Sequence, residues 1–74
     1  MKELELTVLK RAVPEYDLEP GDVGTVVFVH NEGEVFEVEF LTKGGRTIAV
    51  LTLEADEVRP FAANDIMHVR QVVA

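Results

Sequence analysis

Apolar and polar residues alternate with a period of two through most of this 74-residue chain. The clearest case is the segment EVFEVEF. In a strand, its apolar residues share one face, which we expect to point into the core: Phe36, Val38 and Phe40. The carboxylates between them, Glu37 and Glu39, then share the opposite face. Helical periodicity is not sustained anywhere, so strands are expected to build the fold.

Two further segments flank this one and are rich in β-branched residues: VGTVVFVH (Val23–His30) and RTIAVLTL (Arg46–Leu53). The short, glycine-containing connections NEGE and TKGG are typical of hairpins. An antiparallel meander of three strands is therefore expected. An earlier strand is expected over Leu6–Val13, ended by Pro14, because proline cannot donate to a sheet.

After the meander, EADE predicts one helical or 3₁₀ turn, VRPF a short strand, and MHVRQVV (Met67–Val73) a final strand. We expect an all-β fold: a small SH3-like, partly open barrel of five or six antiparallel strands. Residues 1–74 then form a single domain. Residues 61–74 are a C-terminal extension expected to add a strand, either on the first strand or on another chain.

Size and charge limit the partners. A domain this small buries only about 60% of the surface of its unfolded chain, and without cysteine it has neither disulfides nor thiolate zinc sites. A partner or a second copy is the remaining source of stability. The net charge of −7 disfavours nucleic acid and favours a basic protein. No signal peptide or membrane span is apparent, so a cytoplasmic location is expected.

The stretch LEPGDVGTVVFV contains a tight turn that feeds a strand. Gly21 is expected at positive φ, and Asp22 is expected to accept a backbone hydrogen bond that fixes the turn. Gly24, inside the strand, indicates a bulge or a close approach of another backbone segment. The structural interpretation of these three residues is favoured over the functional one, in which the turn contacts RNA.

Two resemblances rest on this stretch. PGDVGTVV resembles the glycine-containing motif of KOW-type SH3-like barrels of ribosomal and transcription-elongation proteins. Val13–Pro60 resembles a family of short bacterial proteins known as domain of unknown function 4926. The matching motifs are GDVGT (21–25), VEF (38–40) and TLEADEVRP (52–60). This second resemblance implies a small stand-alone partner, antitoxin- or immunity-like, without an established activity.

No constellation of residues indicates catalysis. The only imidazoles, His30 and His68, have no visible serine or cysteine partner. Neither Asp65 with His68 nor His30 with Asn31 and Glu32 has the spacing of a known metal site. The hairpin KGGR offers no helix N-terminus to a phosphate. We predict a protein that is not an enzyme and uses no metal or cofactor.

The outer side of the meander is the expected working surface. Some of Val26, Phe28, Ile48 and Val50 then point outward and form an apolar patch crossed by carboxylates. The alternative that stays open is that barrel curvature and the terminal segments cover these residues. The predicted partner contacts are Phe28, Glu37, Glu39, Ile48, Val50 and Val69.

The favoured hypothesis is a non-enzymatic protein-binding module: the acidic neutralising half of a toxin pair, or a self-associating subunit such as a homodimer. Two alternatives stay open. One is an RNA- or ribosome-binding KOW-like module. The other is an accessory subunit of a larger enzyme, since similar barrels occur in the β-subunit of nitrile hydratase.

Overall fold

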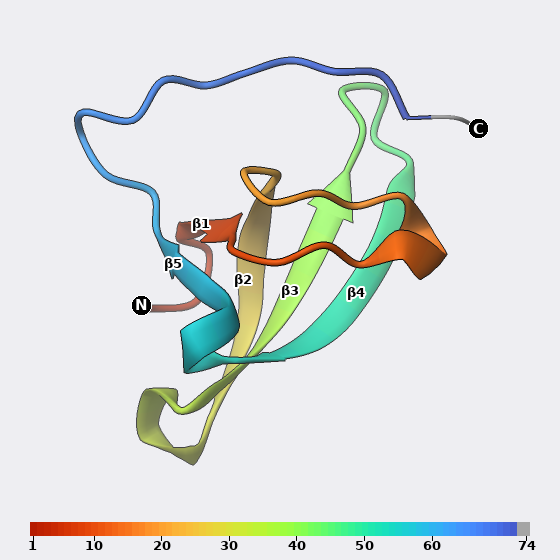
Figure 1. The fold of residues 1–74 in the computed structure, drawn as a ribbon. Coiled ribbons are helices and arrows are strands. Elements are labelled where there is room, and N and C mark those ends of the chain that lie inside the picture. Colours follow the sequence, from red (N-terminus) through yellow and green to blue (C-terminus); the bar gives the residue numbers. More distant parts are fainter. Residues whose placement is uncertain (73–74) are drawn as a thin grey trace.

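The fold of the chain is a five-stranded antiparallel sheet, described for residues 1–72 in a computed structural model (Figure 1). The strands are β1 (Leu6–Leu9), β2 (Val23–His30), β3 (Val35–Leu41), β4 (Thr47–Glu54) and β5 (Val58–Pro60). Their order in the sheet is β4-β3-β2-β1-β5. The edge strands β4 and β5 are not paired with each other, so the sheet is open. The expected all-β, partly open fold is confirmed, with five strands.

The meander forms as the sequence predicts. β2 covers the expected range Val23–His30, and β3 and β4 each lie one residue beyond the predicted segments. The β2–β3 connection is the 3₁₀ turn η2 (Asn31–Gly33). The expected turn after β4 is η3 (Ala55–Glu57), a 3₁₀ turn closed by a capping box between Glu54 and Glu57. The short strand predicted in VRPF is β5.

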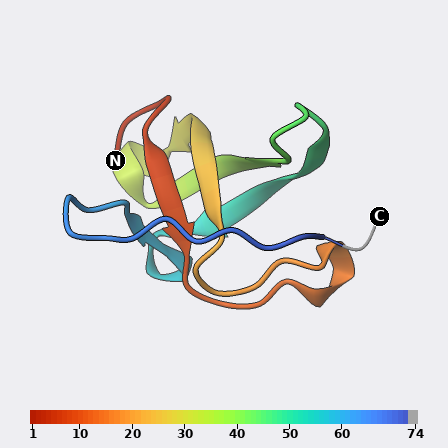
Figure 2. The same ribbon diagram turned by 90° about the horizontal axis from the view of Figure 1, so that it is seen from above.

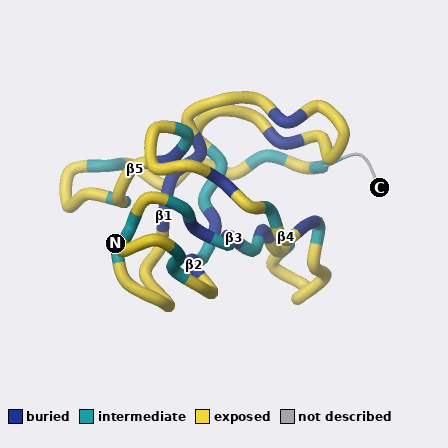
Figure 3. Tube along the Cα trace, turned by 90° about the horizontal axis from the view of Figure 1, so that it is seen from below, coloured by how far each residue is buried: buried dark blue, intermediate teal, exposed yellow. Residues whose placement is uncertain are grey.

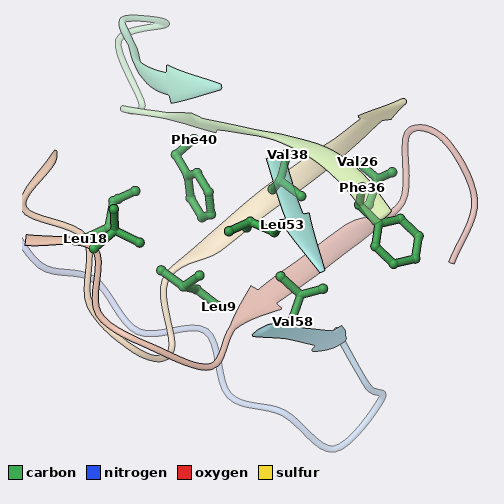
Figure 4. Packing of buried hydrophobic residues seen from close by; sticks show 9 residues of the cluster. Leu9, Leu18, Val26, Phe36, Val38, Phe40, Leu53 and Val58 are labelled. Carbon is green, nitrogen blue, oxygen red and sulfur yellow. The ribbon is translucent and has the colours of Figure 1, made fainter. Parts of the chain in front are cut away.

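The core lies on the concave side of the sheet (Figure 4). Phe36, Val38 and Phe40 are almost fully buried there, which confirms the predicted inner face of β3. Leu9 from β1, Leu53 from β4 and Val58 from β5 pack with them, together with Val13 and Leu18 of the first loop. Figure 3 shows that buried residues are concentrated in the strands and in this loop.

The first strand is shorter than predicted, because β1 ends at Leu9 rather than Val13. The Gly21 N–H donates to the Leu9 carbonyl (2.8 Å), and the Lys10 N–H donates to the Glu57 carbonyl (2.8 Å). Beyond this point the chain turns into the loop. Val13 and Leu18 pair with each other as an isolated bridge and bury both side chains. The 3₁₀ turn η1 (Pro14–Tyr16) lies between them.

The predicted pairing of the final strand with the first strand is wrong for the described part of the extension, and its pairing with another chain stays a prediction. Residues 61–72 form no strand, and Val73, the last residue of the predicted strand, lies outside the described residues. Pairing with β1 is blocked because β2 and β5 already occupy both of its edges. The extension instead runs over the top of the sheet as an extended segment, which Figures 1 and 2 show from two directions.

The turn before β2 has the predicted geometry. Gly21 has φ +95°, in the region that favours glycine, and the Glu19 N–H donates to Asp22 Oδ2 (2.8 Å). At Gly24 the structure agrees with the predicted close approach, because β3 lies directly against this glycine. A Cβ on Gly24 would lie 2.6 Å from Val38 Cγ1 and 3.0 Å from both Phe40 Cε1 and the Glu39 carbonyl oxygen. The bulge alternative at Gly24 is wrong, since the register shifts of the sheet lie elsewhere.

None of the residues 1–72 belongs to a helix long and apolar enough to cross a membrane.

Replacing Gly24 with alanine tests this close contact. The added methyl group overlaps Val38 and the β3 backbone, so Gly24→Ala should lower the free energy of unfolding by about 1–3 kcal/mol. Urea denaturation measures the change. Gly44→Ala is the matched control, because its nearest neighbour is Thr42 Oγ1 at 3.9 Å, and its stability should change by less than about 0.5 kcal/mol. Equal stability of the two variants would contradict the packing described here.

Candidate protein-binding face

The outward side of β2, β3 and β4 gathers four of the six predicted contact residues. Directly opposite residues on neighbouring strands share a face. Phe28 on β2 is opposite Glu37 on β3, and Glu39 on β3 is opposite Val50 on β4. The two carboxylates of β3 therefore lie between an aromatic side chain on one side and an aliphatic one on the other. We call Phe28, Glu37, Glu39 and Val50 the outer face.

A bulge in β2 gives Phe28 its outward position. Residues two apart on a regular strand share a face, so Val26 and Phe28 would normally point the same way. The β2–β3 register shifts between these two residues. Val26 faces inward and is fully buried, while Phe28 faces outward with 49% of its surface exposed. Val29 then faces inward and packs against the core.

Glu37 is held in place by its neighbours. The Thr52 hydroxyl donates to both of its carboxylate oxygens (2.8 and 3.0 Å), and His30 Nε2 lies 2.9 Å from Oε2. The hydrogen bond from Thr52, followed by that from His30, lowers the pKa of Glu37 below its ordinary value. The His30 ring also lies next to the Phe28 ring, with centroids 4.6 Å apart. The aromatic and acidic parts of the outer face are thus joined through His30.

Glu39 has a similar but smaller network. The Thr47 hydroxyl donates to Glu39 Oε2 (2.9 Å). Val50, directly opposite Glu39, exposes 53% of its surface. The same cross-strand row continues through Thr25 of β2 to Leu6 of β1, which is also exposed. Sequence reasoning missed Leu6, because its place in this row follows from the β1–β2 register.

Two predicted contact residues do not belong to the outer face. Ile48 sits at a second register shift, between Phe40 and Leu41 in the β3–β4 pairing, and it packs partly buried against the core. Val69 lies in the C-terminal extension and is 88% exposed. Each lines the groove below this extension rather than the sheet face. Val26, which was weighed as a possible outward residue, is buried.

A group of three carboxylates, Glu54, Asp56 and Glu57, lies at η3 with oxygens within 4.8 Å of one another. Glu57 accepts a hydrogen bond from the Glu54 N–H (2.7 Å) and pairs with Arg11. The bond from Glu54, more than that from Arg11, keeps the pKa of Glu57 below its ordinary value. This group therefore has a structural explanation in the cap of the turn.

Arrangement and chemistry together define a small all-β domain with one exposed sheet face of mixed apolar and acidic character. The model of the family described as "Domain of unknown function (DUF4926)" matches residues 3–60. The chain therefore belongs to this family, as the resemblance in its sequence predicted. No curated protein matches the chain, and neither does any solved structure. The outer face lies within the matched residues, and the C-terminal extension lies beyond them.

The network around Glu37 predicts a measurable titration. The carboxyl should titrate below its ordinary pKa of 4.5, and Thr52→Val should raise this pKa because it removes the strongest hydrogen bond to the carboxylate. An NMR titration of the Glu37 side-chain carboxyl carbon measures both values. Thr47→Val is the control, since Thr47 bonds Glu39 and should leave the Glu37 titration unchanged. Identical curves for the Thr52→Val variant and the unmodified protein would refute the network.

Proposed function

We propose that this chain is a non-enzymatic protein-binding module whose outer face docks a partner that carries basic groups beside apolar side chains. The observation that supports this most directly is the exposure of Phe28 and Val50 on either side of two fixed carboxylates. Aromatic and aliphatic anchors supply most of the binding energy in protein interfaces. Carboxylates beside them select a partner of opposite charge and speed its approach.

The overall charge supports the same partner class. The chain carries fourteen acidic and seven basic side chains, a net charge of −7, so a basic protein is attracted from a distance. Glu37 stays ionised over a wider pH range than an ordinary glutamate, because its pKa is lowered. The negative charge of the outer face is therefore present at neutral pH. The proposal includes a cytoplasmic location and a partner such as a basic toxin. A second copy of the chain is the alternative occupant, and its own charge of −7 opposes this association.

RNA binding through residues 21–24 draws less support. Gly24 is buried against Val38, and the Asp22 carboxylate accepts hydrogen bonds from Arg70 and from the Glu19 N–H. The turn thus offers a bound carboxylate and a buried glycine, whereas nucleic acid binding draws mainly on lysine and arginine.

Affinity capture compares three immobilised chains: the unmodified chain, Phe28→Ser and Ile66→Ser. Proteins retained from a lysate of the native host are quantified by mass spectrometry. Phe28→Ser should reduce retention of the main basic protein at least about tenfold, the loss typical of an interface anchor. Ile66→Ser is the matched control, because Ile66 is 90% exposed outside the outer face and its change should have little effect.

Several outcomes count against the proposal. Equal retention by Phe28→Ser and the unmodified chain would exclude the outer face as the docking surface. Retention of RNA, lost steeply as salt rises, would favour the ribosome-type alternative. A large catalytic chain retained regardless of Phe28 would favour the accessory-subunit alternative. A doubling of mass in sedimentation equilibrium, abolished by Phe28→Ser, would identify the second copy as the partner.

A further inference from the structure

A groove of about 930 Å³ lies beneath the C-terminal extension. One wall is the loop that leads into β2, another is the β3–β4 hairpin, and the extension forms the third side. Figure 1 shows the path of the extension, which arches over the top of the domain. Apolar residues line the groove on both sides: Leu18, Val23, Phe40, Leu41 and Ile48 from the body of the domain, and Met67, Val69 and Val72 from the extension. None of the four outer-face residues lines it, so the groove is a separate surface.

Arg70 holds the extension in this position. Its Nε donates to Asp22 Oδ1 (2.9 Å), and its Nη2 donates to Asp22 Oδ2 and to the Asp17 carbonyl oxygen (2.6 Å). Its Nη1 lies 3.6 Å from Glu19 Oε2. Only 24% of the Arg70 side chain is exposed. We call the turn that carries Asp17, Glu19 and Asp22 the acidic turn, and the binding site that it forms for one guanidinium group the seat.

The seat is prepared by the body of the domain. Asp22 is fixed by the Glu19 N–H, and the turn is tied to β1 by two hydrogen bonds with Leu9, from Gly21 N–H to the Leu9 carbonyl and from Leu9 N–H to the Asp22 carbonyl, each 2.8 Å. Partial burial raises the pKa of Asp22, but the hydrogen bonds from Arg70 and from the Glu19 backbone outweigh this effect, and the pKa lies below its ordinary value. The carboxylate is therefore charged and oriented toward a cation.

The rest of the extension is weakly attached. Among residues 1–72, no backbone–backbone hydrogen bond outside the strands joins residues 66–72 to the body of the domain. Ile66, Met67 and Val69 are exposed, although all three are apolar. Among the described residues of the extension, Arg70 forms hydrogen bonds with the body of the domain, and its apolar neighbours contribute little burial. A segment held in this way is readily exchanged for a similar one.

We infer that the body side of this groove, between the acidic turn and the β3–β4 hairpin, is a binding site for an extended partner segment that carries an arginine flanked by apolar residues, and that the chain's own extension competes with this segment by placing Arg70 in the seat. The seat matches a guanidinium group in charge and in its paired hydrogen bonds. The apolar floor matches aliphatic neighbours of that arginine. This inference does not rest on the outer face.

The test uses the full chain and two synthetic peptides. The first peptide, IMHVRQVVA, has the sequence of residues 66–74, and its twin has glutamine in place of the arginine. Binding is followed by NMR titration of the isotope-labelled Arg70→Gln protein, in which the seat is vacant. The arginine peptide should bind at least about tenfold more tightly than its twin, because a charged, paired hydrogen bond is lost in the twin. The shifting signals should include Leu18, Asp22 and Val23.

Competition is the second arm. The unmodified protein should bind the arginine peptide at least about tenfold more weakly than Arg70→Gln, because the tethered extension acts at a high effective concentration. Arg59→Gln is the matched control, because Arg59 forms an equally close pair with Asp65 (2.8 and 2.9 Å) outside the groove. This variant should bind the arginine peptide with the same affinity as the unmodified protein. The spectrum of each variant shows whether it is folded.

Three results would overturn the inference. Equal affinity of the two peptides would remove the role of the arginine, and this comparison needs no change to the protein's acidic turn. Signals shifting at Phe28 and Val50 instead of the groove would transfer the binding to the outer face. A concentration-dependent dimer of the unmodified protein, abolished by Asp22→Asn, would show that the occupant is the extension of a second copy rather than a partner segment.

Discussion

The packing of β3 between β2 and β4 is the interaction on which the rest of the structure depends. β3 is paired along both edges, and its inward residues Phe36, Val38 and Phe40 fill the centre of the core. Since side chains alternate along a strand, burying these three forces Glu37 and Glu39 to the other side. A slip of one residue would place the carboxylates in the core, so the register is strongly specified. The same packing thus makes both the core and the acidic outer face.

Two register shifts then decide which neighbours join that face. The bulge in β2 separates Val26 from Phe28, and the shift in the β3–β4 pairing separates Ile48 from Val50. In each pair, residues that alternate regularly would point the same way, yet one lies on the core side and the other on the outer face. Bulges often re-aim side chains near functional surfaces. Here they place one aromatic and one aliphatic side chain beside the carboxylates.

These shifts also explain how much of the molecule was predictable from the sequence. The inner face of β3, the range of β2, the turn at Ala55–Glu57 and the positive φ of Gly21 follow from local periodicity and turn chemistry, and all are observed. A bulge adds one residue without a composition cue, so the sequence did not separate Val26 from Phe28. The end of β1 at Leu9 depends on partners distant in the chain, Gly21 and Glu57.

The extension was misread for a related reason. MHVRQVV alternates as a strand does, but both edges of its predicted partner β1 are occupied by β2 and β5, and the described part of the segment does not pair with the open edge of β4 or of β5. The segment is instead attached through Arg70, whose partners in the acidic turn lie about fifty residues earlier in the chain. Alternation alone shows that a segment is compatible with a strand. The tertiary structure determines whether a pairing edge is available.

The division of the sheet into a buried and an exposed side is tested most directly by two valine-to-alanine changes on neighbouring strands. Val38→Ala removes two methyl groups from the fully buried side and should lower the free energy of unfolding by about 2 kcal/mol or more. Val50→Ala makes the same chemical change on the outer face and should cost less than about 1 kcal/mol, within the range of strand propensity. Urea denaturation of both variants gives this comparison, and equal losses would contradict a sheet with one side packed and the other open.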